Sequence, residues 1–301
     1  MTDLRAWTCQ SASTDPGPHA ALLDALPTDL RELTAVVRNL VVHYRAGGVE
    51  LDAERLAEVD LRRLDRRLDA DQRRFGAPLA APRPRAGRVA GCCRDFTLLT
   101  VAALRHRGVP ARSRVGFVGY FDPGFHSDHV VAEYWDGGRW VLVDAELDPA
   151  TDRPFDPVDV PQSVGGFRSA ARVWTDHRRG LIDGARIERY GLAPETPFRG
   201  AWYVHNYVLL ELAHRRRDEL LLWDSWGAMA QGPDGVPAPE LVDEVAGLLL
   251  AADSGDAAAE RELADRYAAD PRLHPGPRVR SFSPTGIFGW TDLDPAPDRT
   301  R

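Results

Sequence analysis

Two adjacent cysteines in the middle of the chain are the strongest candidates for covalent chemistry. Cys92 and Cys93 directly precede an apolar run from Phe96 to Leu104, whose spacing predicts a helix. A thiol at the start of a helix meets free N–H groups and the positive end of the helix dipole, which lower its pKa and favour the nucleophilic thiolate. The same N–H groups can bind the oxyanion that forms when sulfur attacks an acyl carbon. A cysteine in this position is more often only a small buried residue, so the interpretation depends on its partners.

A base for the thiol is expected from a hairpin further along the chain. Residues 129–135 and 139–146 have the composition of two strands, and Asp136-Gly137-Gly138 lies between them as a turn signal. His129 begins the first strand. Nucleophilic catalysis by cysteine needs a nearby base, and that base must be oriented by a third polar group. The hairpin can supply both.

The register of the hairpin decides which carboxylate lies beside His129. With Gly137-Gly138 as a two-residue turn, His129 is directly opposite Glu146, and Val131 is opposite Asp144. Asp144 is then a diagonal neighbour of His129 on the same face, about 7–8 Å away and within side-chain reach. A three-residue turn would change this parity. The spacing by itself therefore leaves both Asp144 and Glu146 open.

The helices and strands that must position these residues are predicted from the spacing of apolar residues and from the positions of glycine and proline. The helix that begins near Cys93 is followed by antiparallel strands, and mostly helical regions lie on both sides, so the order predicts an α+β fold. The C-terminal tail, 270–301, is rich in proline and is expected to be irregular. Strand-like alternation marks 111–121, and helical spacing marks 27–45, 52–75, 203–222 and 238–269.

Three motifs, in order along residues 85–150, resemble the transglutaminase-like superfamily. The first is similar to the start of that family's nucleophile helix, and the second to the turn and strand that follow it. The third is similar to its histidine strand, with H-x3-E, and its aspartate strand, with W-V-x-x-D. The residues that carry the resemblance are Gly91-x-Cys93-Arg94-Asp95-Phe96, then Leu104-Arg105 with Gly108-Val109-Pro110-Ala111-Arg112, then His129 with Glu133, and Trp140-Val141 with Asp144.

The resemblance implies a papain/transglutaminase-like core, in which the nucleophile helix packs on an antiparallel sheet. It also implies one residue for each catalytic role, where the residues alone left alternatives. These are Cys93 rather than Cys92 as the nucleophile, His129 rather than His126 as the base, and Asp144 rather than Glu146 as the orienting carboxylate.

The chain is expected to divide into three regions of one domain. Residues 1–75 form a helical region packed on the core, 76–160 form the transglutaminase-like catalytic core, and 161–301 form a mostly helical region that completes the same domain. The C-terminal half also carries scattered tryptophans, most of them expected in the core and some at a substrate pocket: Trp174, Trp202, Trp223, Trp226 and Trp290.

Other residues near the motifs have simpler explanations. His126 and His129 form an H-x-x-H pair, but in a loop the pair lacks the helical geometry of the H-E-x-x-H zinc motif. Glu133 is expected to be structural, and Arg94 and Asp95 are expected to pair locally or to hold the start of the helix. We therefore expect no metal and no other cofactor.

Composition narrows the class of partner. The formal net charge of −7 argues against nucleic acid, which favours a basic surface. All 38 basic side chains are arginine, so the protein has no lysine amine to offer in self-crosslinking. Three cysteines do not make a disulfide framework. The N-terminus lacks the pattern of a signal peptide and no segment reads as a membrane helix, so we expect a cytoplasmic protein without a membrane partner.

These observations predict cysteine-dependent acyl transfer through an acyl-thioester enzyme. The substrate is expected to be a small-molecule or peptide amide, ester or thioester, and the intermediate is resolved by water or by an amine acceptor. The alternative is a transglutaminase-like fold kept only as a binding module. Degenerate members of that kind commonly lack the cysteine, the histidine or the aspartate, whereas all three are present here.

Overall fold

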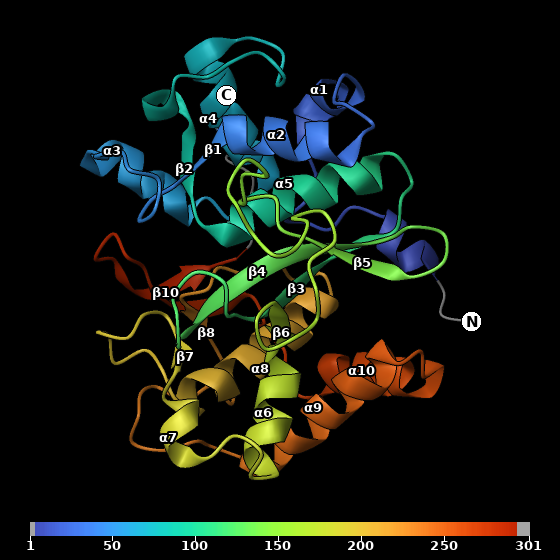
Figure 1. The fold of residues 1–301 in the computed structure, drawn as a ribbon, viewed down its shortest axis with the longest axis vertical. Coiled ribbons are helices and arrows are strands. Elements are labelled where there is room, and N and C mark those ends of the chain that lie inside the picture. Colours follow the sequence, from blue (N-terminus) through green and yellow to red (C-terminus); the bar gives the residue numbers. More distant parts are fainter. Residues whose placement is uncertain (1–3, 294–301) are drawn as a thin grey trace.

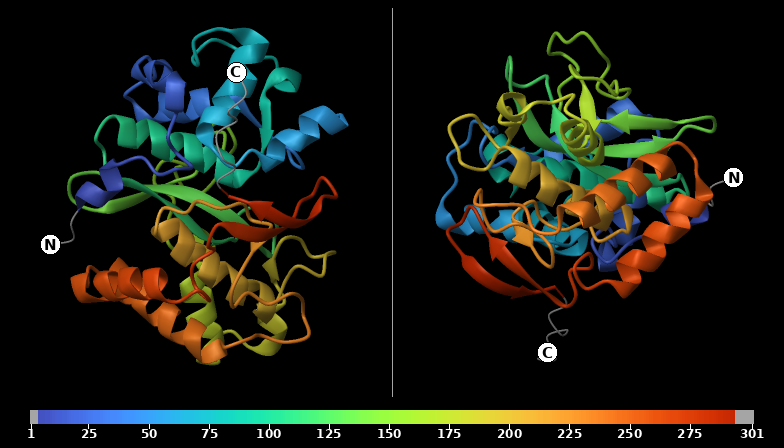
Figure 2. Two further views of the ribbon diagram at one scale, coloured as in Figure 1. Left: turned by 180° about the vertical axis from the view of Figure 1, so that it is seen from behind. Right: turned by 90° about the horizontal axis from the view of Figure 1, so that it is seen from below.

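An antiparallel sheet crosses the middle of the molecule, and helices from the two halves of the chain lie on either side of it (Figure 1). The computed structural model describes residues 4–293. The N-terminal helices and α5 lie on one side of the sheet, and α6 to α10 lie on the other, as the views from behind and below also show (Figure 2). The predicted α+β fold, with the nucleophile helix packed on an antiparallel sheet, is confirmed.

The sheet is built around one long antiparallel pair. Strand β3 (Ala111–Val118) pairs with β4 (His126–Trp135) along its whole length. Strand β5 (Trp140–Val143) pairs with the other side of β4, and β6 (Phe167–Ser169) pairs with β3. The short β7 (Tyr190–Gly191) runs parallel to the beginning of β4.

The predicted two-residue hairpin is confirmed. Asp136 N–H donates to the carbonyl of Arg139 at 3.1 Å, and Gly137 has a φ of 103°, a conformation that favours glycine. Strand β5 is shorter than the predicted 139–146. It ends at Val143, because Asp144 turns its N–H to a carbonyl of the following loop at 2.8 Å.

Helix α5 (Cys93–His106) is the central element of the N-terminal side. Residues 93–105 are all buried, so the helix is packed on every face rather than on one stripe. Thr97 Oγ donates to the carbonyl of Val130 at 2.8 Å, which ties the helix to β4. The helix ends where Gly108 adopts a φ of 72°, as the Gly-Val-Pro segment predicts.

The remaining N-terminal elements differ in part from the sequence-based expectation. The Asp29 side chain caps α2 by accepting two backbone N–H bonds. The predicted continuous helix over 52–75 is wrong: it breaks after a 3-10 turn at 57–60. Asp60 in that turn accepts hydrogen bonds from Trp223 and Ser283, and these long-range contacts fix the bend. The elements are α1 (Ala20–Asp24), α2 (Leu30–Leu40), α3 (Ala53–Leu56) and α4 (Leu64–Phe75).

A short parallel pair of strands leads into α5 and was not predicted. Its first strand falls within the predicted helix over 27–45, which ends at Leu40. Strand β1 (Val41–His43) pairs with β2 (Val89–Gly91), with His43 opposite Gly91. Each strand has only three residues, and the partners are far apart in sequence, so no local pattern marks them. Their consequence is that His43 is fixed beside the start of α5.

The C-terminal half is mostly helical, with three departures from expectation. The predicted helix over 203–222 ends at Arg215. The predicted helix over 238–269 is interrupted at Gly255, whose φ is 95°. The predicted irregular tail contains a hairpin that also pairs with β8; residues 294–301 lie outside the described part. The elements are α6 (Ala170–Arg178), α7 (Gly184–Ile187), α8 (Ala201–Arg215), β8 (Asp224–Ser225), α9 (Pro239–Asp253), α10 (Ala257–Ala269), β9 (Arg278–Phe282) and β10 (Phe288–Asp292). None of the helices within residues 4–293 combines the length and apolar composition needed to span a bilayer.

A buried network of charges joins the sheet to the C-terminal helices. Glu133 binds both Arg112 and Arg114, with an Oε2 to Arg114 Nη1 distance of 3.0 Å. Asp253 of α9 binds Arg114 and Arg215, each at 2.6 Å. Burial acts to raise the pKa of Glu133, but the two arginines outweigh it and keep the pKa below its usual value. The contacts of Glu133 agree with the structural role expected for it.

Replacing this carboxylate is expected to destabilise the protein. Glu133→Gln should lower the free energy of unfolding by about 3 kcal/mol or more, because it removes the counter-charge of buried guanidinium groups. Glu262→Gln, which breaks an exposed pair with Arg266, is the matched control and should cost less than about 1 kcal/mol. Urea denaturation measures both. Equal losses for the two variants would contradict the structural role.

Candidate active site

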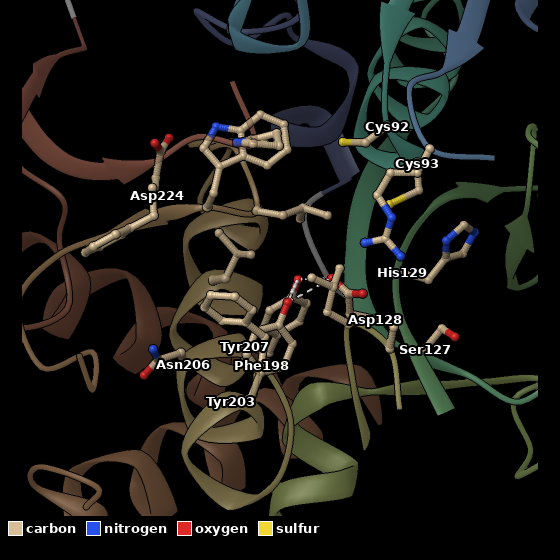
Figure 3. A pocket seen from close by; sticks show the side chains of 18 of the residues that line it. Cys92, Cys93, Ser127, Asp128, His129, Phe198, Tyr203, Asn206, Tyr207 and Asp224 are labelled. Atoms are coloured by element: carbon tan, nitrogen blue, oxygen red, sulfur yellow. Dashed lines mark hydrogen bonds between the residues drawn. The ribbon is translucent and has the colours of Figure 1, made fainter. Parts of the chain in front are cut away.

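A cavity of about 900 Å³ opens between the start of α5 and helix α8. Cys93 and His129 both lie on its wall, and the side chains around them come from distant parts of the chain (Figure 3). Cys93, His129 and Asp144 are 5%, 2% and 2% exposed, so charges in this site act in surroundings largely shielded from bulk water. Such shielding strengthens every electrostatic contact discussed below.

Asp95 fixes the start of the helix that carries Cys93. Its Oδ2 accepts the backbone N–H of Cys92 at 2.8 Å, and its Oδ1 binds Arg67 at 2.8 Å and Arg94 at 3.0 Å. The expectation that Arg94 and Asp95 hold the helix start is therefore confirmed. Because the Cys92 N–H is occupied, Cys93 is the first residue of α5 whose N–H has no acceptor among the described residues.

The glycine of the G-x-C motif is explained by the same carboxylate. A Cβ atom added to Gly91 would lie 2.6 Å from Asp95 Oδ2 and 3.1 Å from Arg67 Nη1. Any larger residue would push Asp95 away from the helix start. The motif thus encodes the packing that places Cys93.

His129 is held by a hydrogen bond from its Nε2 to Asp144 Oδ2 at 2.8 Å. The same oxygen accepts the Tyr120 hydroxyl at 2.6 Å, and Asp144 Oδ1 accepts the N–H of Glu146 at 3.0 Å. Burial acts to raise the pKa of Asp144, but His129 and these donors outweigh it, so the pKa is lowered and the group is ionised. With Nε2 bound, Nδ1 is the ring nitrogen left for the thiol.

The structure thus places Asp144, not Glu146, on the imidazole. The family resemblance implied Asp144 for this position. The hairpin spacing alone could not exclude Glu146, which is directly opposite His129 in the register. Glu146 is close by on the cavity wall, where its buried Oε2 has no hydrogen-bond partner. Burial raises the pKa of Glu146 to about 7. Glu146 can therefore change charge near neutral pH beside the site.

The electrostatics of Cys93 differ from the sequence-based expectation. A hydrogen bond with the Cys92 side chain, burial, and the negative charges of Glu146 and Asp128 all raise the pKa of the Cys93 thiol. The prediction that the helix terminus lowers the pKa of Cys93 is therefore wrong, because the pKa of this thiol is raised overall. Burial of the His129 ring acts to lower the pKa of that ring. The charge and hydrogen bond of Asp144 outweigh burial, so the pKa of His129 is raised overall. These shifts disfavour the thiolate form of Cys93 and strengthen His129 as a proton acceptor.

The H-x-x-H pair is split by the structure. The His126 ring stacks on Tyr190, with centroids 4.3 Å apart, whereas His129 binds Asp144. Within residues 4–293, no group of three or more His, Cys, Asp or Glu side chains is arranged to hold a metal ion.

Three residues of the cavity wall were missed by the sequence analysis. The Asp128 carboxylate accepts the hydroxyl groups of Tyr203, at 3.1 Å, and of Tyr207, and the two hydroxyls are 3.0 Å apart (Figure 3). Burial raises the pKa of Asp128. The signal that could have found Asp128 is its position next to His129, but its partners on α8 are too distant in sequence to infer.

The expectation that most of these tryptophans lie in the core is wrong, because only two of the five are buried; the expectation that some line a pocket agrees with the cavity wall. Trp174 and Trp226 are buried in the core, and Trp202 and Trp223 line the cavity. Trp290 lies on β10 and is exposed.

Comparison with known proteins identifies the class of the central segment. The model of the family described as "Transglutaminase-like superfamily" matches residues 71–145, a quarter of the chain, and this segment holds α5, β3, β4 and β5. The chain therefore contains a transglutaminase-like domain.

The comparison with solved structures gives a partial alignment, and the comparison with curated proteins gives no match. A crystal structure from Cytophaga hutchinsonii, described as that of a "Putative Cysteine Protease", aligns with a TM-score of 0.31 and 20% identity, covering 49% of this chain and 44% of that one. The alignment thus spans less than half the length of that protein. No curated protein matches the chain.

The pKa directions predict how Cys93 responds to alkylation. Its rate should be low at pH 6 and rise with pH, because the thiolate forms only above the raised pKa. At pH 8, Glu146→Gln should speed alkylation by roughly threefold to tenfold, since it removes a charge worth up to about one pKa unit. Mass spectrometry of the modified peptides measures each site, with the exposed Cys9 as internal control. A flat profile from pH 6 to pH 9, or a slower Glu146→Gln, would contradict these directions.

Proposed function

We propose that the protein is a cysteine-dependent acyltransferase or hydrolase, with Cys93 as nucleophile, His129 as base and Asp144 as the orienting carboxylate. The observation that supports this proposal most directly is the His129–Asp144 hydrogen bond on the wall of the cavity that also holds Cys93 at the first position of α5. This combination provides a nucleophile, a base and a fixed orientation for the base.

In the proposed reaction the thiol proton passes to Nδ1 of His129 as sulfur attacks the carbonyl carbon of the substrate. The carbonyl π electrons move to oxygen, and the N–H of Cys93 can donate to this oxyanion. When the oxyanion collapses, the bond to the leaving group breaks and the imidazolium gives its proton to that group. Water or an amine then attacks the thioester, with His129 again taking and returning the proton, and the free thiol is restored.

The charges around the site fit proton transfer during attack better than a preformed thiolate. The raised pKa of Cys93 disfavours a free thiolate. The carboxylates of Asp144, Glu146 and Asp128 raise the pKa of His129, so they stabilise the imidazolium that forms as the proton moves. The negative charges that oppose a resting thiolate therefore also stabilise the imidazolium that forms in the reacting state.

The cavity favours an acyl donor larger than a simple acid. Its volume of about 900 Å³ and the aromatic side chains of Phe198, Trp202 and Trp223 suit a small-molecule or peptide substrate with apolar groups. The same space can admit water or an amine acceptor. Because the chain has no lysine, an amine acceptor would be another molecule.

The nucleophile is tested by trapping the acyl-enzyme. After incubation of the protein with cell extract or with a nitrophenyl ester, intact-protein mass spectrometry should show an acyl adduct, and Cys93→Ala should abolish it. Cys92→Ala should keep the adduct, since it removes a hydrogen bond that raises the pKa of Cys93. An adduct that survives in Cys93→Ala and disappears in Cys92→Ala would reverse the assignment. A wild-type protein that never acylates would favour the non-catalytic binding module.

The orienting carboxylate is tested against its neighbour. Asp144→Asn should lower turnover by about 10⁴-fold, because the imidazole loses the partner that fixes its tautomer. Glu146→Gln should change turnover by less than about tenfold, since it makes no hydrogen bond to the ring. Steady-state kinetics with the same ester, alongside circular dichroism to verify folding, separates the two. Comparable losses of turnover in both variants would contradict the proposal that Asp144 alone orients the His129 ring.

A further inference from the structure

His43 lies on the cavity wall close to the nucleophile. It is the last residue of β1 and is paired with Gly91, two positions before Cys93. The next residue extends this contact, because Tyr44 N–H donates to the carbonyl of Gly91 at 2.9 Å. His43, Cys92 and Cys93 line the same cavity. The parallel strand pair therefore fixes His43 on the wall of the cavity that also holds Cys93.

The hydrogen bonds of His43 fix which ring nitrogen carries the proton. Its Nδ1 accepts the backbone N–H groups of Arg45 and Ala46, both at 3.1 Å, so the neutral ring must carry its proton on Nε2. Burial, followed by the nearby charge of His129, lowers the pKa of His43 to about 4. The ring is therefore neutral at pH 7 and presents one N–H donor at Nε2.

That donor is not used elsewhere in the described part of the chain. No acceptor for His43 Nε2 occurs within residues 4–293, and the atom is not among the buried polar atoms that lack a partner. It consequently keeps accessible surface, and His43 lines both this cavity and a smaller neighbouring one. A neutral imidazole N–H held in this way can polarise a carbonyl without giving up its proton.

The helix start leaves room for such a donor. The Cys92 N–H is bound by Asp95, so the oxyanion would meet the N–H of Cys93 from the helix side. Oxyanion sites work best with more than one donor aimed at the developing charge. His43 stands on β1, a separate element from α5, and so can supply a donor from another direction.

The geometry points to His43 as the second oxyanion donor of the site, acting through Nε2–H on the carbonyl oxygen of the acyl substrate. The assignment rests on the proposed acyl transfer at Cys93. During attack the carbonyl oxygen gains negative charge and accepts this hydrogen bond. No proton leaves His43, and the bond weakens again when the carbonyl reforms.

Two amide variants separate the donor from the structural role of the ring. His43→Asn places an amide oxygen near the position of Nδ1, so it can still accept the N–H groups of Arg45 and Ala46, but it lacks a donor at the Nε2 position. His43→Gln places an amide N–H₂ near Nε2. Acylation of Cys93 by a nitrophenyl ester should fall by about 10²–10³-fold in His43→Asn, and His43→Gln should recover at least about tenfold of that loss.

Alkylation of Cys93 by iodoacetamide is the control reaction, because displacement of iodide builds no oxyanion. Its rate in both variants should remain within about threefold of the wild type. Equal acylation in His43→Asn and wild type, or a parallel loss of acylation and alkylation, would overturn the assignment while leaving the proposed function in place. A wild-type protein that is alkylated but never acylated at Cys93 would overturn the proposed function, and the role of His43 with it.

Discussion

The carboxylate of Asp95 is the contact on which the geometry of the site depends. It binds the N–H of Cys92, and it is neutralised by Arg67 and Arg94. A buried carboxylate is tolerated only with such partners. The three-way contact ends strand β2, starts α5 at Cys93 and requires glycine at position 91. A local rule, that a helix start needs an acceptor for its free N–H groups, thereby fixes the position of Cys93, the proposed nucleophile.

A second constraint is the excess of negative charge around His129. Asp144 binds its ring directly, and Glu146 and Asp128 act from nearby positions in the cavity. In surroundings largely shielded from water, these groups favour an imidazolium and disfavour a thiolate. His43 is affected in the opposite way, because burial and the charge of His129 keep it neutral. One cavity therefore holds two imidazoles whose pKa values are shifted in opposite directions, and the difference comes from their neighbours.

The sequence could predict what depends on neighbouring residues. The Gly137-Gly138 signal marked the turn of the hairpin, and the apolar run from Phe96 to Leu104 marked α5, because both follow from short-range rules. The choice of Cys93 came from the family resemblance. The sequence could not predict the β1–β2 pair, the bend at Asp60 or the hydrogen bonds from tyrosines to Asp128. Each of these contacts joins residues tens of positions apart. The sign of the Cys93 pKa shift was missed for the same reason. It is set by burial and by carboxylates that arrive only with the tertiary fold.

The transglutaminase-like match ends at residue 145, but residues beyond it also line the cavity. Tyr203 and Tyr207 of α8 line the cavity together with Cys93 and His129 (Figure 3), and Trp223 beside β8 also lines it. The buried charges that join Glu133 to Asp253 fix the C-terminal helices against the sheet. The matched segment thus holds the residues proposed to carry out the bond-making steps, while residues outside it shape the space for the substrate. In the proposed acyl transfer, the choice of acyl donor and acceptor would depend on wall residues outside the match, which come from residues 43–46 as well as from the C-terminal half.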